Sequence, residues 1–222
     1  MNQAHPFAAL GDRLHAARLL AVATLTRVED AAPLADALRA GGVTAVELAL
    51  RAPAALEALA AFRAAAPDLL LGAGTVLSPD QADAAHAAGA DFALAPGLDA
   101  ATVRHCAALG FPFIPGVATP SDIQSAVVLG CRLLKFFPAK PMGGLRGLET
   151  LAAPFAHLGV RYVPLGGIDA DDAVAYAASP LVAAVGGSWI ASPDSIRRRA
   201  WDEIRERALR AVSLTRPAHA TA

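Results

Sequence analysis

Residues 133–138 read Leu-Leu-Lys-Phe-Phe-Pro, an apolar run with one charged side chain, Lys135, inside it. A short, continuous apolar run of this kind is typical of a strand buried on both faces of a parallel sheet. Similar runs recur along the whole chain, separated by Ala-rich segments with helical periodicity. The eight predicted strands are Leu19–Leu25, Ala45–Leu50, Leu69–Val76, Phe92–Pro96, Phe111–Val117, Cys131–Phe137, Arg161–Pro164 and Val182–Val185.

This alternation predicts an α/β fold, a (β/α)₈ TIM barrel that forms a single domain over residues 1–222. We expect an extra N-terminal helix at about Phe7–Ala17, a long C-terminal helix at about Ser195–Val212, and a disordered tail over residues 216–222. The alternative is an open doubly wound sheet. The barrel is favoured because no G-x-G-x-x-G motif follows the first strand, and because distinctive residues recur after many strands.

The composition favours a folded chain with a large apolar core. The chain has 222 residues, 55% of them hydrophobic and 18% charged, with a net charge of −1. Disorder is therefore not expected, and neither is a nucleic-acid partner, which would normally need a basic surface. No signal peptide or membrane-spanning run is evident. Cys106 and Cys131 form no CxxC motif and are expected to be free thiols in a reducing cytoplasm. The histidines lack metal-ligand spacing, so we expect neither a metal nor a cofactor.

Lys135 is one of only two lysines in a chain with seventeen arginines. Arginine keeps its proton, whereas a lysine amine that is removed from water can lose its proton and act as a nucleophile. Burying a charged lysine among apolar residues is costly, which favours the neutral, reactive form. We therefore predict that Lys135 forms a Schiff base with a ketone. The second lysine, Lys140, lies in a loop between two prolines and is expected to be solvated.

Polar side chains are predicted to meet Lys135 at the carboxyl ends of the strands, where barrels of this class carry their active sites. Because Glu47 is placed there, it is predicted to act as a general acid/base. Its alternative role is a structural ion-pair partner of Lys135 or Arg51. Arg51 is predicted to clamp a carboxylate, because its guanidinium matches two carboxylate oxygens. The alternative for Arg51 is an exposed arginine at the end of a strand.

Two glycine pairs, Gly166-Gly167 and Gly186-Gly187, follow the seventh and eighth predicted strands, and Ser188 comes next. Gly-rich turns at these two positions expose backbone N–H groups and often bind phosphate in this fold. Ser188 would add a hydroxyl donor. The alternative is that the glycines only allow tight turns between strand and helix.

Six segments carry distinctive motifs in a fixed order: Glu47–Arg51, Gly72–Leu77, Pro115–Pro120, Leu134–Ala139, Gly166–Ile168 and Val185–Trp189. Together they resemble the 2-keto-3-deoxy-6-phosphogluconate (KDPG)/4-hydroxy-2-oxoglutarate aldolases. The resemblance implies a class I aldolase, a lyase of sugar-acid catabolism in the Entner-Doudoroff route. It also implies a homotrimer whose ligands are a 2-keto acid and pyruvate.

The resemblance also implies roles for individual residues. Lys135 becomes the Schiff-base lysine and Glu47 the proton shuttle. The residues implied around the pyruvate part are Arg51, Thr75 and Pro96, and those around the phosphate are Gly166, Gly167 and Ser188.

Leu165 stands where the family usually has a threonine that helps to orient the substrate. The loss of that hydroxyl leaves the stereochemical preference open between KDPG and its galactonate epimer, with 4-hydroxy-2-oxoglutarate as a further substrate. Two competing functions remain open beside the aldolase. One is a phosphate-binding isomerase or synthase without imine chemistry, and the second is a non-catalytic sugar-phosphate sensor.

Overall fold

The computed structural model describes residues 6–216, and its strands form two parallel sheets. The first sheet has the order β5-β4-β3-β2-β1-β9, and the second has the order β6-β7-β8. The strands are β1 Leu19–Ala23, β2 Ala45–Ala49, β3 Leu70–Gly74, β4 Phe92–Leu94, β5 Phe113–Ile114, β6 Gly116–Val117, β7 Leu133–Phe136, β8 Arg161–Pro164 and β9 Val185–Gly187.

The two sheets meet at two places. The fifth predicted strand, Phe111–Val117, is not continuous: Pro115 separates β5 from β6, because proline has no N–H for a strand ladder. At the opposite side, β8 lies beside the residues that precede β9. There Tyr162 forms a parallel bridge with Val182, and the Ala183 N–H donates to the Tyr162 carbonyl over 2.8 Å.

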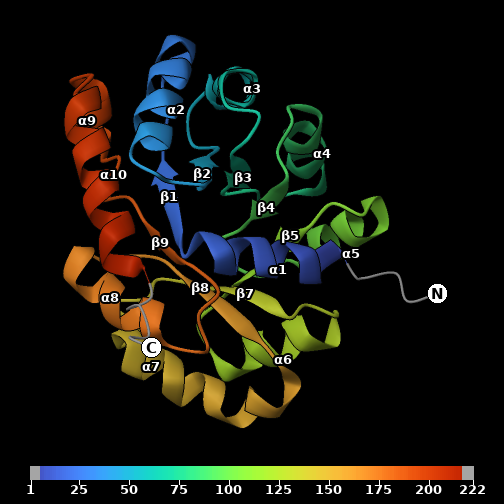
Figure 1. Cartoon of the computed structure of the whole chain (residues 1–222). Helices are drawn as coiled ribbons and strands as arrows, with labels where there is room; N and C mark the ends of the chain where they lie inside the picture. The colour runs from blue at the N-terminus through green and yellow to red at the C-terminus, as the bar shows by residue number, and fades with distance from the viewer. Residues whose placement is uncertain (1–5, 217–222) are drawn as a thin grey trace.

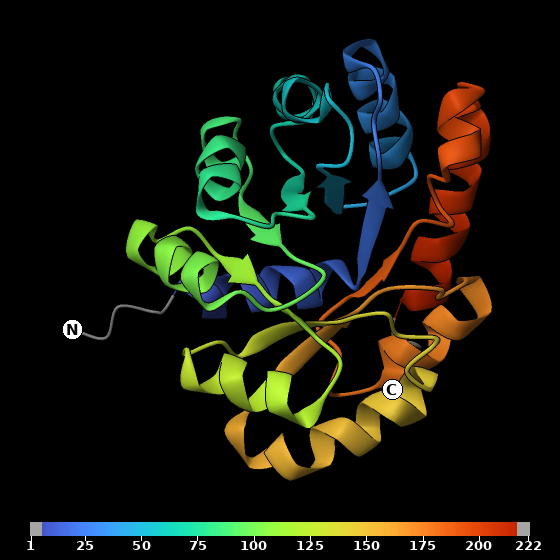
Figure 2. The same cartoon turned by 180° about the vertical axis from the view of Figure 1, so that it is seen from behind.

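Helices surround the strands, as Figures 1 and 2 show from opposite sides. No helix within residues 6–216 is long and apolar enough to cross a membrane. The helices are α1 Pro6–Ala17, α2 Ala31–Ala40, α3 Ala55–Ala65, α4 Pro79–Ala87, α5 Ala100–Leu109, α6 Pro120–Val128, α7 Gly144–Ala152, α8 Ala170–Ala178, α9 Pro193–Arg197 and α10 Trp201–Thr215, with 3₁₀ turns η1 Val28–Asp30 and η2 Ala153–Leu158.

The prediction of one C-terminal helix over Ser195–Val212 was wrong, because the chain turns between α9 and α10. Arg199 adopts a left-handed conformation, with φ of 54°. From there its Nε donates to Oδ1 of Asp30 over 2.9 Å. Asp30 is 2% exposed and also pairs with Arg27. A buried carboxylate needs such partners, and this tertiary demand overrides the local helical pattern. Most of the predicted tail, residues 217–222, lies outside the described residues.

Two layers of apolar side chains form the core. The outer layer packs the helices against the strands. The inner layer gathers inward-facing residues from β1, β2, β3, β4, β5, β7 and β8. Leu10 and Leu14 of α1 belong to the inner layer, so this helix packs across one end of the strands (Figure 1). The polar residues of the interior lie at the opposite end, where the strands have their carboxyl ends.

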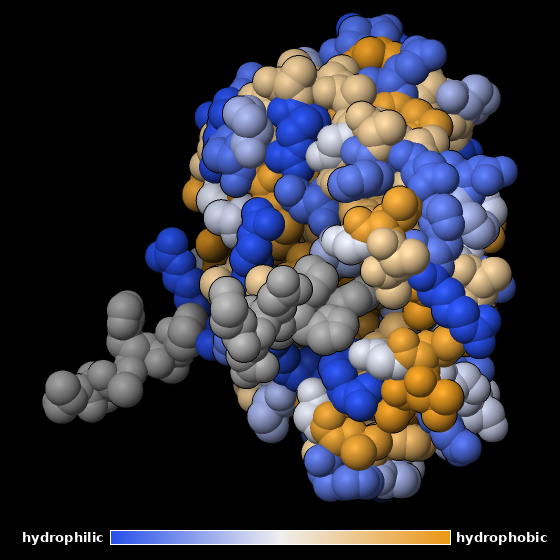
Figure 3. All heavy atoms as spheres, turned by 90° about the vertical axis from the view of Figure 1, so that its right-hand side faces the viewer, coloured by the Kyte–Doolittle hydropathy of each residue, from blue (hydrophilic) through white to orange (hydrophobic). Residues whose placement is uncertain are grey.

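The surface mixes apolar and hydrophilic residues. Figure 3 shows apolar residues scattered among hydrophilic ones on the face that lies to the right in Figure 1. Large apolar side chains are exposed on α5 and α6, where Leu109 is 46% and Val128 is 80% exposed. Isolated exposed residues of this kind are common on folded proteins.

Candidate active site

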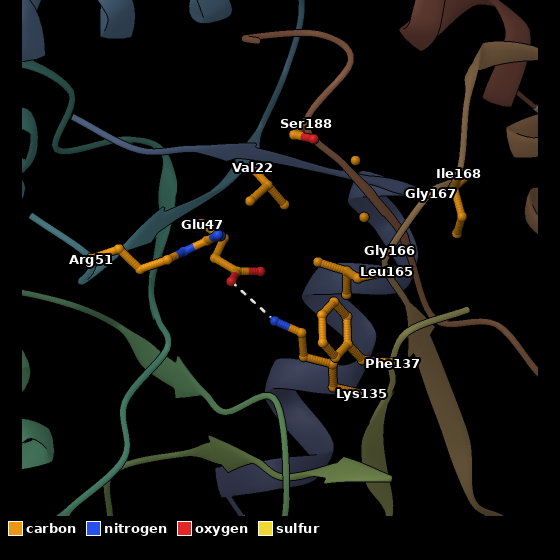
Figure 4. Close-up of a pocket in the computed structure, with 12 residues that line it drawn as sticks. Val22, Glu47, Arg51, Lys135, Phe137, Leu165, Gly166, Gly167, Ile168 and Ser188 are labelled. Carbon is orange, nitrogen blue, oxygen red and sulfur yellow. Dashed lines mark hydrogen bonds and ion pairs between the residues drawn. The ribbon is translucent and has the colours of Figure 1, made fainter. Parts of the chain in front are cut away.

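A cavity of about 180 Å³ opens at the carboxyl ends of the strands (Figure 4). It brings together residues that lie in or directly after β1, β2, β7, β8 and β9, which are distant in the sequence. Its lining residues are Val22, Glu47, Arg51, Lys135, Phe137, Leu165, Gly166, Gly167, Ile168, Gly186, Gly187 and Ser188.

Lys135 and Glu47 meet inside this cavity. Alternate residues of a strand face the same side, so Lys135 continues the inward row of Leu133, and Glu47 continues that of Ala45. The Lys135 Nζ donates to Glu47 Oε1 over 3.2 Å, and the two side chains are 6% and 1% exposed. The apolar inner core thus ends in a buried ion pair, where desolvation raises the cost of each charge.

Glu47 keeps one acceptor free. Its Oε2 is buried and has no hydrogen-bond partner among the described residues. Its Oε1 lies so close to Gly74 that a Cβ there would approach it to 2.1 Å. Any side chain at position 74 would therefore displace the carboxylate. The unpartnered oxygen is available to accept a hydrogen bond from a bound molecule or water.

Phe137 forms one wall beside the lysine. The Lys135 Nζ lies 5.4 Å from the centroid of the Phe137 ring. Arg51 follows β2 and extends to the cavity from the side of Glu47 (Figure 4). Its exposed guanidinium gives the mouth a second cation. An apolar wall beside two cations suits a small acid that carries both a methyl or methylene group and a carboxylate.

The glycine turns line the opposite side of the cavity. Gly166 and Gly167 have φ of 101° and 78°, values that L side chains rarely adopt. Leu165 is 4% exposed and packs so closely on Gly186 that a Cβ at position 186 would lie 2.3 Å from Leu165 Cγ. Ser188 lies at the same rim as these turns (Figure 4).

Two predicted residues lie apart from this cavity lining. Thr75 follows β3 with a left-handed φ of 60°, and Pro96 follows β4. Neither belongs to the residues that line the cavity. Pro96 contacts the start of β6 instead: a Cβ at Gly116 would lie 2.2 Å from its carbonyl oxygen. Their roles toward a substrate stay predictions.

Three further residues that line the cavity, Val22, Phe137 and Ile168, were not predicted from the sequence as site residues. All three are apolar, and apolar residues give no polar signal at a strand end. Phe137 could have been found from its spacing, because it lies two positions after Lys135 and therefore faces the same side. Within residues 6–216, no group of three or more histidine, cysteine or acidic side chains is placed to hold a metal ion.

Comparison with known proteins places this geometry in a family. The family model for KDPG and KHG aldolase matches residues 10–207. A 2-dehydro-3-deoxy-phosphogluconate aldolase of Treponema pallidum is 45% identical over 83% of this chain and 87% of that protein. The KHG/KDPG aldolase of Escherichia coli K12 is 37% identical over 86% of this chain and 89% of its own length.

A solved structure agrees with these sequence relatives. It is a KDPG aldolase from Legionella pneumophila with pyruvate captured at low pH as a covalent carbinolamine intermediate. It shares 38% sequence identity and superposes with a TM-score of 0.85, covering 90% of this chain and 96% of that one. The match of the family model over almost the whole chain, together with these relatives, shows that the chain belongs to the KDPG and KHG aldolase family.

Proposed function

We propose that this chain is a class I aldolase that cleaves KDPG, 4-hydroxy-2-oxoglutarate or both through a Schiff base on Lys135. The products would be pyruvate and an aldehyde, glyceraldehyde 3-phosphate or glyoxylate. The observation that carries the proposal is the buried pair of Lys135 and Glu47, 3.2 Å apart in a cavity with an arginine and two glycine turns. The names of the relatives point to the same chemistry.

The chemistry begins at Lys135. Its neutral amine attacks the C2 carbonyl of the substrate to give a carbinolamine, which loses water to form a protonated imine. The imine withdraws electrons when the C3–C4 bond breaks. The electron pair of that bond moves onto C3 and the imine, and an enamine of pyruvate forms. Glu47 lies 3.2 Å from this amine, so it can accept the amine proton before the attack and return it to the hydroxyl that leaves as water.

Glu47 moves the protons. Its carboxylate takes the proton of the C4 hydroxyl as the aldehyde forms, directly or through one water. The same carboxyl then protonates C3 of the enamine, and hydrolysis of the resulting imine releases pyruvate and restores the amine. The oxygen without a partner, Oε2, supports this role because it can accept the hydroxyl while Oε1 remains beside the lysine.

The remaining residues would bind the two ends of the substrate. Arg51 would hold the carboxylate of the pyruvate part with a bidentate contact, and Thr75 and Pro96 would complete that end. The N–H groups of the turns at Gly166-Gly167 and Gly187, with the Ser188 hydroxyl, would bind the phosphate.

A second candidate substrate is the galactonate epimer of KDPG. Leu165 favours it as an alternative, because this buried side chain offers no hydroxyl to distinguish one substrate epimer from the other. A cleavage assay with KDPG, its epimer and 4-hydroxy-2-oxoglutarate separates the three.

We further infer that the two sheets close into one eight-stranded (β/α)₈ barrel, with α1 packed across its amino end. The bridge between Tyr162 and Val182 supports closure on one side, and the short interval at Pro115 supports it on the other. Residues 1–222 would then be one domain.

We also propose that the protein is a homotrimer in the cytoplasm. Sedimentation of the purified protein tests the oligomeric state.

Trapping with borohydride tests the proposed function. Pyruvate and sodium borohydride are added together, and the imine is reduced to a stable secondary amine. Peptide mass spectrometry should find the adduct on Lys135 and none on Lys140. An intact protein without an adduct, or one that keeps full activity after the treatment, would refute the Schiff-base mechanism.

A further inference from the structure

Lys140, the second lysine, is 55% exposed, in agreement with the prediction that it is solvated, but it also makes specific contacts. Its Nζ donates to Oδ2 of Asp169 and to Oδ2 of Asp172, both over 3.1 Å. Asp169 in turn caps the start of α8, since its Oδ1 accepts from the N–H groups of Asp171 and Asp172. The side chain of Lys140 therefore ties the segment after β7 to the first turn of α8.

The same residue supports the Gly166-Gly167 turn from the side away from the cavity. Its backbone N–H donates to the Gly166 carbonyl over 2.9 Å, and the preceding residue, Ala139, donates to the Leu165 carbonyl over 2.7 Å. A Cβ at Gly167 would lie 2.9 Å from the Cβ of Lys140. The turn thus has the cavity on one side and the lysine on the other.

Such support matters because a pair of glycines in left-handed conformations has unusual backbone freedom. A donor group that must be ordered each time a ligand binds loses affinity, whereas one held in place beforehand does not. The lysine holds the turn at three points: through the backbone hydrogen bond, through its aliphatic stem, and through the two carboxylates that begin the next helix. The carboxylate contacts also raise the pKa of Lys140, chiefly through the hydrogen bond to Asp172, so the amine stays charged at neutral pH.

We propose that Lys140 is a positioning residue that fixes the Gly166-Gly167 turn for the phosphate end of the substrate. It contributes no contact to the substrate and takes no part in imine chemistry. This inference rests on the proposed function, because it requires that the turn bind a phosphate. It predicts an effect confined to phosphorylated substrates.

The test compares steady-state kinetics with KDPG and with 4-hydroxy-2-oxoglutarate, which has no phosphate. K140M keeps the aliphatic stem and removes the charge, and it should raise KM for KDPG about threefold with kcat unchanged, the modest size expected for an exposed ion network. The kinetics with 4-hydroxy-2-oxoglutarate should not change. K140R should restore a KM for KDPG near that of the wild type.

Arg39 supplies the matched control, because it also bridges two exposed carboxylates, Asp36 and Asp68, but on α2 and away from the cavity. R39M should leave the KM for both substrates unchanged. If K140M changes neither substrate, or changes both equally, Lys140 does not position the phosphate turn. If the wild type cleaves 4-hydroxy-2-oxoglutarate but shows no preference for a phosphorylated substrate, the inference fails while the aldolase function stands. A wild type that cleaves neither substrate refutes both.

Discussion

Lys135 and Lys140 lie close together in the sequence and make ion pairs of nearly equal length, 3.2 Å and 3.1 Å. Their surroundings differ. Lys135 and Glu47 are 6% and 1% exposed, whereas Lys140 and Asp169 are both 55% exposed. Water screens the second pair but not the first, so the same geometry gives a reactive and costly pair in one place and a mild positioning contact in the other. Burial, rather than distance, separates the two roles.

The largest effect is expected from Glu47→Gln, which keeps the shape of the buried partner but removes its ability to accept a proton. Turnover should fall about 10²- to 10⁴-fold, the usual contribution of a positioned acid or base. The adduct with pyruvate should still form on Lys135 under borohydride. Turnover and trapping are measured on the same preparation. Wild-type turnover in this variant would remove Glu47 from the proton transfers.

The stability of single and paired substitutions tests the buried pair directly. Lys135→Met leaves the Glu47 carboxylate buried without a partner and should cost about 3–5 kcal/mol of unfolding free energy. The double variant K135M/E47L removes both charges and should be at least as stable as the wild type. Urea unfolding measures both, and K140M serves as the exposed counterpart with little change. A double variant as unstable as K135M would show that the cost is one of packing.

The two cysteines show the effect of burial on a titratable group that has no ion-pair partner. Desolvation raises the pKa of Cys106 and of Cys131 to about 11 from an ordinary value of 9.0. At pH 8 their thiolate fraction should be about 10²-fold below that of free thiols, with alkylation slowed at least as much. Mass spectrometry after timed iodoacetamide treatment measures this rate, with urea-unfolded protein as the control. Rapid alkylation of the native protein would contradict the burial.

The same thiols set an alkaline limit on stability. The folded chain holds these protons to higher pH than the unfolded chain does, so their contribution is complete below pH 9 and declines as pH rises toward 11. Tyr162 and Tyr176 add to the decline above pH 10, because burial raises the pKa of each hydroxyl to about 12. Urea unfolding from about pH 8 to about pH 10.5 should show a steady loss.

A modest effect is expected at Leu165. Leu165→Thr should place a hydroxyl at the cavity wall and change the ratio of kcat/KM for KDPG and its galactonate epimer about fivefold toward KDPG, the size expected for one hydrogen bond to a substrate hydroxyl. Leu165→Val matches threonine in shape without the hydroxyl and should leave the ratio unchanged. Equal ratios in the two variants would assign any change to cavity size.

Much of the fold could be predicted from the sequence, because strands buried on both faces appear as short continuous apolar runs. The ends of β1, β2 and β3 were predicted to within two residues. The errors came from interactions that a local pattern does not contain. The bend at Arg199 depends on Asp30, which is distant in sequence.

The candidate site also has parts that the sequence predicts and parts that it does not. Lys135 was predictable because a charge inside an apolar run is conspicuous in sequence, and the structure sets Glu47 against it. The contacts of Lys140 were not predictable, because its partners Asp169 and Asp172 belong to the next strand–helix unit. Sequence shows which group is unusual. The packing of separate units shows what an ordinary group touches.

The contact between Leu165 and Gly186 has a consequence for how this enzyme can evolve. The leucine occupies the space that a side chain at position 186 would need, so a larger residue at one position requires a smaller one at the other. An alanine at 186 should therefore be harmful beside leucine but acceptable beside a smaller residue at 165. The order of substitutions therefore matters: residue 165 has to become smaller before position 186 can gain a side chain.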